Sequence, residues 1–382
     1  MKNFNLDAIL EAMLKVSDRV SDLNFSVGRP PQVEVDGQLV PVTFPGLPRL
    51  TPFQTETIAL QMLRGDRELT RTLLSNGSVD LSYSIPQKTR FRVNIFSQRG
   101  TYAIVLRVIP EGIPSLASLK LPDELYNVCR IKNGIVLVTG PTGSGKSTTL
   151  AAIINQINLE QAYHIITIED PVEYMHRHQK STVNQRELGS DTKTFSLALR
   201  AALRQAPKVI LIGEMRDVET IEIAMEAAET GHLVLSTLHT IDAAKTVDRI
   251  IGVFPKDQEP QIRTRLSQSF RYVISQRLLP KIGGGRVAVL EVLKSTMRTR
   301  DYVVKGESEG RSLNDAMHDG AVDGMQTFDD EIEKYWNQNV ISKETALAYA
   351  TNPTNLALRL TDDPTGPPAG EGDGDSMLSM LE

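Results

Sequence analysis

Hydrophobic residues in the first quarter of the chain recur with two different periods. Leu6, Leu10 and Met13 repeat at the three- and four-residue spacing of an amphipathic helix. The dipeptide Asp36-Gly37 separates two short runs in which apolar and polar residues alternate, which is typical of a two-residue β-hairpin. Helical spacing then covers residues 52–74, and strand-like alternation covers 79–85, 91–95 and 102–108. These patterns predict a small α+β domain over residues 1–109.

The pattern changes after about residue 122. Continuous apolar runs alternate there with longer helical stretches, as expected for a parallel sheet that is buried on both faces. The apolar runs cover 135–139, 164–168, 208–213 and 232–236, and helical patterns are expected over much of 258–279 and 312–350. We therefore expect an α/β domain over 122–361. A breaker-rich linker at 110–121 precedes it, and an acidic, Pro/Gly-rich tail at 362–382 is expected to be disordered.

The strongest chemical signal is a glycine-rich loop between an apolar strand and a helix. Gly140 is followed after four residues by Gly145-Lys146-Ser147, which is the spacing of a P-loop. Backbone N–H groups of such a loop turn toward a phosphate, the lysine pairs with the β- and γ-phosphates, and the serine hydroxyl can bind Mg²⁺. The loop predicts binding of a nucleoside triphosphate with Mg²⁺. The predicted nucleotide-binding residues are Gly140, Thr142, Gly143, Ser144, Gly145, Lys146, Ser147 and Thr148.

Carboxylates follow two other predicted strands. Glu169, Asp170 and Glu173 come after the second strand, and Glu214 comes after the third. Ligands of an open parallel sheet bind beyond the carboxyl ends of its strands. We expect Glu214 to activate water or polarise the metal, with Glu169 as its partner, and which of the two accepts the proton stays open. Metal ligands, partly through water, are expected among Ser147, Glu169, Asp170, Glu173 and Glu214, although Asp170 and Glu173 are nearly as well explained as ordinary strand-end acids.

Two histidines stand near the fourth predicted strand. His232 and His239 are seven residues apart, which is not a compact set of metal ligands, and no cysteine accompanies them. A γ-phosphate sensor is the better functional interpretation, and a structural role is the alternative for each histidine.

Arginines mark the first domain. Alternation places Arg92 on the face of its strand opposite Phe91 and Val93, and places Arg107 on the corresponding face of the next strand. Exposed arginines are common on a solvated sheet. The other use of such residues is as arginine fingers that reach the phosphates of a neighbouring subunit.

Composition excludes several classes of protein. The formal net charge of −5 among 382 residues gives no general attraction to nucleic acid, and this disfavours a DNA motor. The one cysteine, Cys129, excludes an intramolecular disulfide framework and a four-cysteine metal site. Neither a signal peptide nor a transmembrane segment is recognisable, so we expect a cytoplasmic protein.

Taken together, these motifs resemble the secretion-type hexameric ATPases, and most of all the type IV pilus retraction motors of the PilT/PilU family. The resemblance rests on the residues around Glu169, on the segment from Gly213 to Thr240, on Arg92-Val-Asn94 with Arg99-Gly100, and on the late run Gly324–Asp329. It implies a RecA-like P-loop core with a smaller PAS-like α+β N-terminal domain, assembled as a homohexamer with ATP between the two domains. It also implies that Arg92 and Arg107, and less surely Arg99, complete a neighbour's site.

The resemblance implies a location at the inner membrane, beneath a pilus platform protein, and a partnership with a paralogous ATPase ring is a further option. One departure concerns the segment 295–306, which differs from the helix of PilT-type motors that follows the core. An accessory PilU-like motor is therefore as credible as the main retraction ATPase. The alternatives are a nucleotide-gated module with little turnover of its own, and an ATPase of pilus assembly or type II secretion.

Overall fold

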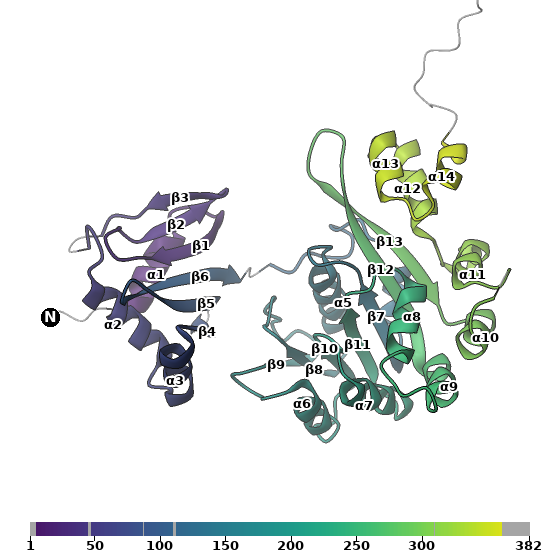
Figure 1. Ribbon diagram of the computed structural model, residues 1–382, viewed down its shortest axis with the longest axis horizontal. Helices are drawn as coiled ribbons and strands as arrows, with labels where there is room; N and C mark the ends of the chain where they lie inside the picture. Colours follow the sequence, from purple (N-terminus) through teal and green to yellow (C-terminus); the bar gives the residue numbers. More distant parts are fainter. Residues whose placement is uncertain (1–4, 45–46, 87, 110–111, 309, 361–382) are drawn as a thin grey trace, which may run out of the picture.

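The structure is a computed structural model that describes residues 5–44, 47–86, 88–109, 112–308 and 310–360. Within these residues the chain forms two sheets, one in each half, and each sheet has its own hydrophobic core (Figure 1). The predicted tail at 362–382 and residues 110 and 111 of the predicted linker lie outside the described residues. The domain boundaries given above therefore stay predictions.

The N-terminal sheet has six antiparallel strands in the order β3-β2-β1-β6-β5-β4. Its strands are β1 (Val20–Phe25), β2 (Gln32–Val35), β3 (Gln38–Pro41), β4 (Ser78–Ile85), β5 (Thr89–Gln98) and β6 (Thr101–Ile109), and its helices are α1 (Leu6–Leu14), α2 (Pro52–Leu63) and α3 (Arg67–Asn76). Phe91, Val93 and Ile95 of β5 are buried with the helices, whereas Arg92 between them is exposed. One face of this sheet therefore packs on helices and the other carries polar side chains.

The C-terminal sheet has seven strands in the order β13-β12-β7-β11-β10-β8-β9, all parallel except β13. The strands are β7 (Gly134–Thr139), β8 (His164–Glu169), β9 (Thr182–Glu187), β10 (Val209–Ile212), β11 (Leu233–Leu238), β12 (Phe270–Pro280) and β13 (Arg286–Lys294). Helices of this half are α4 (Glu124–Val128), α5 (Lys146–Glu160), α6 (Phe195–Ala202), α7 (Val218–Glu229), α8 (Ala243–Ile251), α9 (Glu259–Ser269), α10 (Met297–Lys305), α11 (Leu313–Asp319), η1 (Ala321–Asp323), α12 (Phe328–Asn337), α13 (Lys343–Tyr349) and α14 (Pro353–Arg359).

Helices cover both faces of this second sheet. Val136 and Val138 of β7 pack with α4 and α5, whereas Ile135 and Leu137 of the same strand pack in a second core with α6 to α9. A strand buried on both sides needs apolar residues at every position, and this explains the unbroken apolar runs of the sequence. The arrangement also aligns the carboxyl ends of the parallel strands at one edge.

The helical expectation for residues 258–279 is wrong in its second half. Helix α9 ends at Ser269, and residues 270–280 form β12, which lies between β7 and β13. Tyr272, Val273 and Ile274 are aromatic or β-branched, and such residues favour a buried strand. Strands β9 and β13 were not predicted either, so the sheet is wider than the sequence pattern indicated.

The C-terminal helices α12 to α14 pack on the β12–β13 hairpin. Phe328, Ile332 and Trp336 contact a small separate core that includes Leu279 and Val289 of the hairpin. Glu331 of α12 is 5% exposed and accepts a hydrogen bond from the Leu290 N–H of β13. Burial raises the pKa of this carboxyl to about 7.

The raised pKa of Glu331 gives a first prediction. The folded chain holds the proton more tightly than the unfolded chain, so this contribution to stability is complete below pH 4.5 and is lost as the pH rises toward 7. The unfolding free energy of the wild type should fall between pH 5 and pH 7.5. In Glu331→Gln this fall is expected to be smaller by about 2 kcal/mol. Urea titrations at both pH values measure this. The exposed Glu222→Gln is the control, and an unchanged pH dependence in Glu331→Gln would contradict the assignment.

Candidate nucleotide site

The loop between β7 and α5 has the conformation that its glycines allow. Gly140, Gly143 and Gly145 have φ values of 142°, 79° and 90°, which side chains rarely permit. A Cβ on Gly140 would lie 2.3 Å from the carbonyl oxygen of Gln276 in β12. The Lys146 ammonium donates to the carbonyl oxygens of Gly140 and Pro141 at 2.9 and 3.0 Å. These contacts hold a tight loop at the amino end of α5, as binding of phosphate requires.

The crowding at Gly140 gives a second prediction. Gly140→Ala combines a strained φ with a clash against β12, so the free energy of unfolding is expected to fall by about 2–4 kcal/mol. Gly143→Ala is the matched control, because it has a positive φ but nothing within 4 Å of the added methyl group. Chemical denaturation compares the two variants. Equal losses of stability would contradict the role given to the contact with β12.

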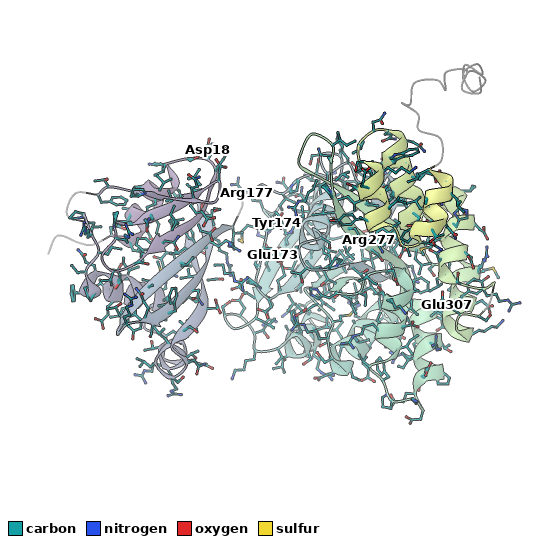
Figure 2. The ribbon with its side chains drawn as sticks, turned by 45° about the horizontal axis from the view of Figure 1, so that its top comes forward. Asp18, Glu173, Tyr174, Arg177, Arg277 and Glu307 are labelled. Atoms are coloured by element: carbon teal, nitrogen blue, oxygen red, sulfur yellow. The ribbon has the colours of Figure 1, made fainter. Side chains whose placement is uncertain are left out.

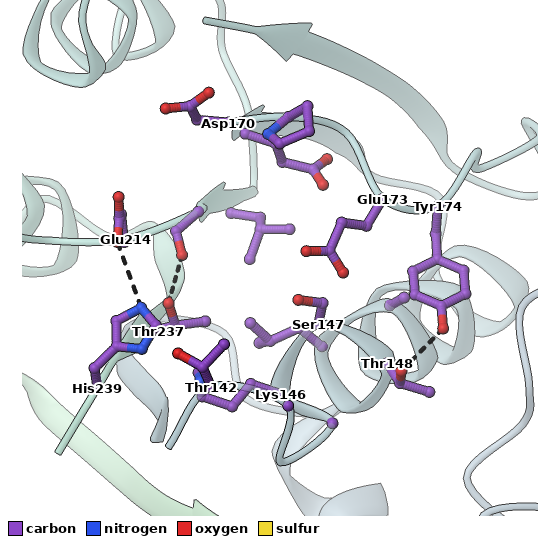
Figure 3. A pocket seen from close by; sticks show the side chains of 18 of the residues that line it. Thr142, Lys146, Ser147, Thr148, Asp170, Glu173, Tyr174, Glu214, Thr237 and His239 are labelled. Carbon is purple, nitrogen blue, oxygen red and sulfur yellow. Dashed lines mark hydrogen bonds and ion pairs between the residues drawn. The ribbon is translucent and has the colours of Figure 1, made fainter. Parts of the chain in front are cut away.

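A cavity of about 560 Å³ lies over this loop and gathers residues from several strand ends. Figure 3 shows its interior. Most of the predicted site residues line it: Thr142, Gly143, Gly145, Lys146, Ser147, Thr148, Glu169, Asp170, Glu173, Glu214 and His239. Gly140 and Ser144 are not among its lining residues, and Ser144 is buried below the loop surface. The carboxyl edge of the sheet therefore brings the loop and the acids together, as the sequence predicted.

Glu214 lies just after the end of β10, within reach of the side chains of Arg216 and His239. Its carboxylate is 2.7 Å from the Nε of Arg216. It is also 3.6 Å from the Nε2 of His239, the pair joined by a dashed line in Figure 3. The Glu214 side chain is 16% exposed, so it faces the cavity rather than bulk water. Hydrogen bonds from Thr237 to the Gly213 carbonyl at 2.6 Å and from Ser236 to the Ile212 carbonyl at 2.8 Å fasten this strand end to β11. The acid is held in place from both sides.

Glu169 also lines the cavity, and its carboxyl group is desolvated by burial. Its carboxyl accepts hydrogen bonds from Thr167 at 2.6 Å and from Gln185 at 3.2 Å, and burial raises its pKa despite these donors. The opposite shift affects Lys146, because desolvation lowers its pKa and the charges of Glu173 and Glu214 act against that change. A lysine and two acids are thus coupled in one low-dielectric cavity, which is typical of a functional site.

The remaining acids belong to the loop after β8. In Figure 3 the carboxylate of Glu173 points across the cavity toward the Ser147 hydroxyl, whereas that of Asp170 points away from it. Next to Glu173, the Tyr174 hydroxyl lies 2.9 Å from the Oγ1 of Thr148 and ties this loop to α5. Carboxylate and hydroxyl oxygens are suitable ligands for Mg²⁺. Glu173 is better placed to act near Ser147 than Asp170 is.

The two histidines lie at opposite ends of the fourth predicted strand, β11. Strand β11 begins at Leu233, so His232 lies at the amino edge of the sheet and His239 at the carboxyl edge, beside Glu214. The His232 Nδ1 lies 2.9 Å from the Ala227 carbonyl oxygen, and His232 is not among the residues that line the cavity. Because β11 lies between the two residues in the chain, within one chain only His239 is placed to sense a phosphate.

The arginines of the N-terminal sheet do not all lie together. Arg92 of β5 is directly opposite Arg107 of β6, and Arg107 is held at 3.0 Å by the buried Asp22 of β1. Arg99 lies in the turn after β5, about 23 Å along the strand from Arg92. None of the three is among the residues that line the cavity of the same chain. The trans role predicted for Arg92 and Arg107 stays a prediction, and Arg99 is separated from them.

Sequence reasoning missed several residues of the site, among them Gln276, Arg286, Tyr174 and the Arg216 that pairs with Glu214. Gln276 of β12 is buried, donates to the Ser144 carbonyl and accepts from Thr149, both at 2.7 Å, so it braces the loop from below. Arg286 and Tyr174 line the cavity. A strand predicted over residues 270–280, from their aromatic and β-branched side chains, would have placed Gln276 beside the loop.

Comparisons with known proteins agree with this geometry. The family described as "Type II/IV secretion system protein" matches residues 60–330. The chain belongs to this family. The PilT retraction ATPase of Pseudomonas aeruginosa is 42% identical over 336 residues, which are 88% of this chain and 96% of PilT. The PilU ATPase of the same organism is 40% identical over 370 residues, which are 97% of this chain and 94% of PilU.

A solved structure extends the likeness to three dimensions. The crystal structure of the retraction motor PilT with bound ADP is 43% identical, has a TM-score of 0.81, and covers 93% of this chain and 100% of its own. The RecA-like core with an N-terminal domain is therefore confirmed. The ATPase relatives also show that the chain is an ATP hydrolase that binds nucleotide. Among the described residues, every helix is too short or too polar to cross a bilayer.

Proposed function

We propose that this protein is a Mg²⁺-dependent ATPase that assembles as a ring of six and powers the retraction of type IV pili. One observation supports this above all. The P-loop, Glu169 and Glu214 line a single cavity, and the arginines suited to the transferred phosphate are on a different domain that does not reach that cavity. Such a division of parts is expected when a site is completed by a neighbouring subunit.

The residues present fit a magnesium ion that is shared with the phosphates of ATP. No group of three or more histidine, cysteine or carboxylate side chains forms a metal cage within the described ranges. Magnesium is usually held by one or two carboxylates and by substrate phosphates, so this is the expected condition. Ser147, with Glu173 and Glu214 through water, would hold the ion, which when bound offsets the charge that develops on the phosphates.

Within the site, the residues of this chain have separate tasks. Lys146 would leave its carbonyl partners for the β- and γ-phosphates, and Glu214 would orient and deprotonate the attacking water with Arg216 and His239 keeping its carboxylate in place. Glu169 lies beside it with a raised pKa and is available as a proton acceptor or hydrogen-bond partner. Arg92 and Arg107 of the adjoining subunit would offset the negative charge that develops on the transferred phosphate.

The mechanical role follows from the relatives. PilT is named a retraction ATPase, and a protein of Neisseria gonorrhoeae that is 48% identical over 284 residues is named for twitching motility. By the same reasoning the ring would work in the cytoplasm against an inner-membrane platform protein. Changes in the angle between the two domains would convert hydrolysis into movement of that partner.

A PilU-like accessory role is the second candidate, because the alignment with PilU spans 97% of the chain and that with PilT 88%. In this role the ring would act beside a paralogous ATPase ring.

The test is a clean deletion in the source organism together with assays of the purified protein. Excess pili that do not retract, with phosphate release from ATP and Mg²⁺ in the purified protein, support the main retraction role. Partial loss of retraction supports the accessory role. Cells without pili would instead indicate an assembly ATPase and would overturn the proposal.

A further inference from the structure

A buried carboxylate joins the two halves of the chain. Glu187 ends β9 at the edge of the C-terminal sheet and is 4% exposed. Two of its donors come from the N-terminal sheet: the Ser82 hydroxyl of β4 and the Arg90 guanidinium of β5, the latter at 2.8 Å. A third donor is the backbone N–H of Val172 at 3.0 Å. One side chain therefore connects the N-terminal sheet to the loop that carries the acids of the nucleotide site.

The position of Glu187 relative to that loop is fixed by the strand register. In the parallel pair β8–β9, Glu187 lies opposite Glu169, and the N–H of Leu188 donates to the Glu169 carbonyl at 2.9 Å. Val172 is 1% exposed and stands in the chain next to Glu173, which lines the cavity. In Figure 2 Glu173, Tyr174 and Arg177 lie on the side of the C-terminal half that faces the N-terminal sheet. A shift of the Glu187 carboxylate would therefore displace the acidic loop.

The N-terminal partners lie on the same sheet face as the candidate arginine fingers. Asp22, Arg107, Arg92 and Ser82 form one row across β1, β6, β5 and β4. Arg90 is two residues before Arg92 on β5, so the two arginines share a face. The sheet that binds Glu187 through Ser82 and Arg90 is thus the same sheet that carries Arg92 and Arg107. Arg90, Arg92 and Arg107 therefore have to move together.

The contact can hold and can also open. A half-open contact would leave the charges of Glu187 and Arg90 buried without partners, which is costly. The two sheets are therefore favoured either in full contact or fully separated, with both charges in water. The side chain of Arg90 is 18% exposed and its Nε is buried without a hydrogen-bond partner among the described residues. The closed contact is therefore not fully satisfied, and this lowers the cost of separating the two sheets.

From these observations we infer that Glu187 is a positioning residue that couples the orientation of the chain's own N-terminal domain to the acidic loop of its own nucleotide site. When the N-terminal sheet docks through Ser82 and Arg90, the loop from Glu169 to Glu173 is held at the cavity. When the sheet rotates to present Arg92 to a neighbour, Glu187 loses two donors and the loop is released. The inference depends on the ATPase activity proposed above.

The test uses the full-length protein and two readouts, one of which does not need catalysis. Cysteines introduced at the exposed positions Leu60→Cys and Leu197→Cys carry spin labels on the two halves, and Cys129 is 2% exposed and stays unlabelled. Labelled protein is diluted with unlabelled protein and measured with ADP. We expect Arg90→Ala to broaden or shift the distance distribution, whereas Arg19→Ala, which removes an exposed ion pair inside the N-terminal half, leaves it unchanged.

Kinetics supply the second readout. Arg90→Ala and Glu187→Gln are each expected to lower kcat about 10- to 100-fold, while the affinity for ADP changes by less than about twofold because the P-loop is untouched. Their effects should not multiply in the double variant, since both remove one contact, and Arg90→Lys should recover part of kcat. An unchanged distance distribution in Arg90→Ala, or multiplicative losses in the double variant, overturns the inference. A wild-type protein that releases no phosphate overturns the proposed activity instead.

Discussion

Replacing Glu214 by glutamine is expected to lower kcat for ATP hydrolysis about 10²- to 10⁴-fold, the range lost when a general base is removed. The substitution keeps the size of the side chain but removes the negative charge that lies 2.7 Å from Arg216 and 3.6 Å from His239. Binding of nucleotide should change little, because the P-loop and Lys146 keep their contacts. Phosphate release at saturating ATP, with ADP affinity measured in parallel, gives the two numbers.

Glu219→Gln is the matched control for this experiment. Glu219 lies on α7, five residues further along the chain, and its pair with Arg200 is more than half exposed, so its loss should leave kcat unchanged. A Glu214→Gln protein that keeps more than about a tenth of the wild-type kcat would contradict its assignment as the base and would transfer that role to Glu169.

Replacing Arg92 by alanine is expected to lower kcat about 10³-fold, the smaller end of the effect of an arginine finger. Arg92 is exposed on its sheet and stands next to Arg107, whose position is fixed by Asp22. Since Arg92 is not among the residues that line its own cavity, ADP should bind to the variant as to the wild type. Steady-state kinetics and ADP titrations measure the two effects. A variant with weaker ADP binding and an unchanged kcat would contradict a role in the transition state.

Local sequence patterns predicted those parts of the fold that depend on a single turn or on the burial of a single strand. The hairpin at Asp36-Gly37 forms as expected, with φ values of 53° and 80°, because few residues accept that turn. The parallel strands were recognisable because burial on both faces leaves unbroken apolar runs. Strand β12 was not, because its aromatic and β-branched residues directly follow a helix and no turn signal separates them.

The candidate site divides in the same way. The P-loop and the acids at strand ends could be predicted, because strand ends of a parallel sheet converge at one edge. Gln276 could have been placed only by recognising β12, and Glu187 could not be predicted, because its partner Ser82 is 105 residues away in the chain. Contacts between distant segments, rather than local preference, decide these residues.

The central claim is that ATP in one subunit is cleaved with the help of an arginine from the next subunit. The most direct test mixes Lys146→Ala protein with Arg92→Ala protein, each inactive alone, and follows phosphate release across the mixing ratios. At equal amounts in freely exchanging rings, about one quarter of the interfaces would pair an intact P-loop with an intact neighbouring arginine, and activity should return in that proportion. Absence of recovery at every ratio, in rings shown to exchange subunits, would contradict the claim.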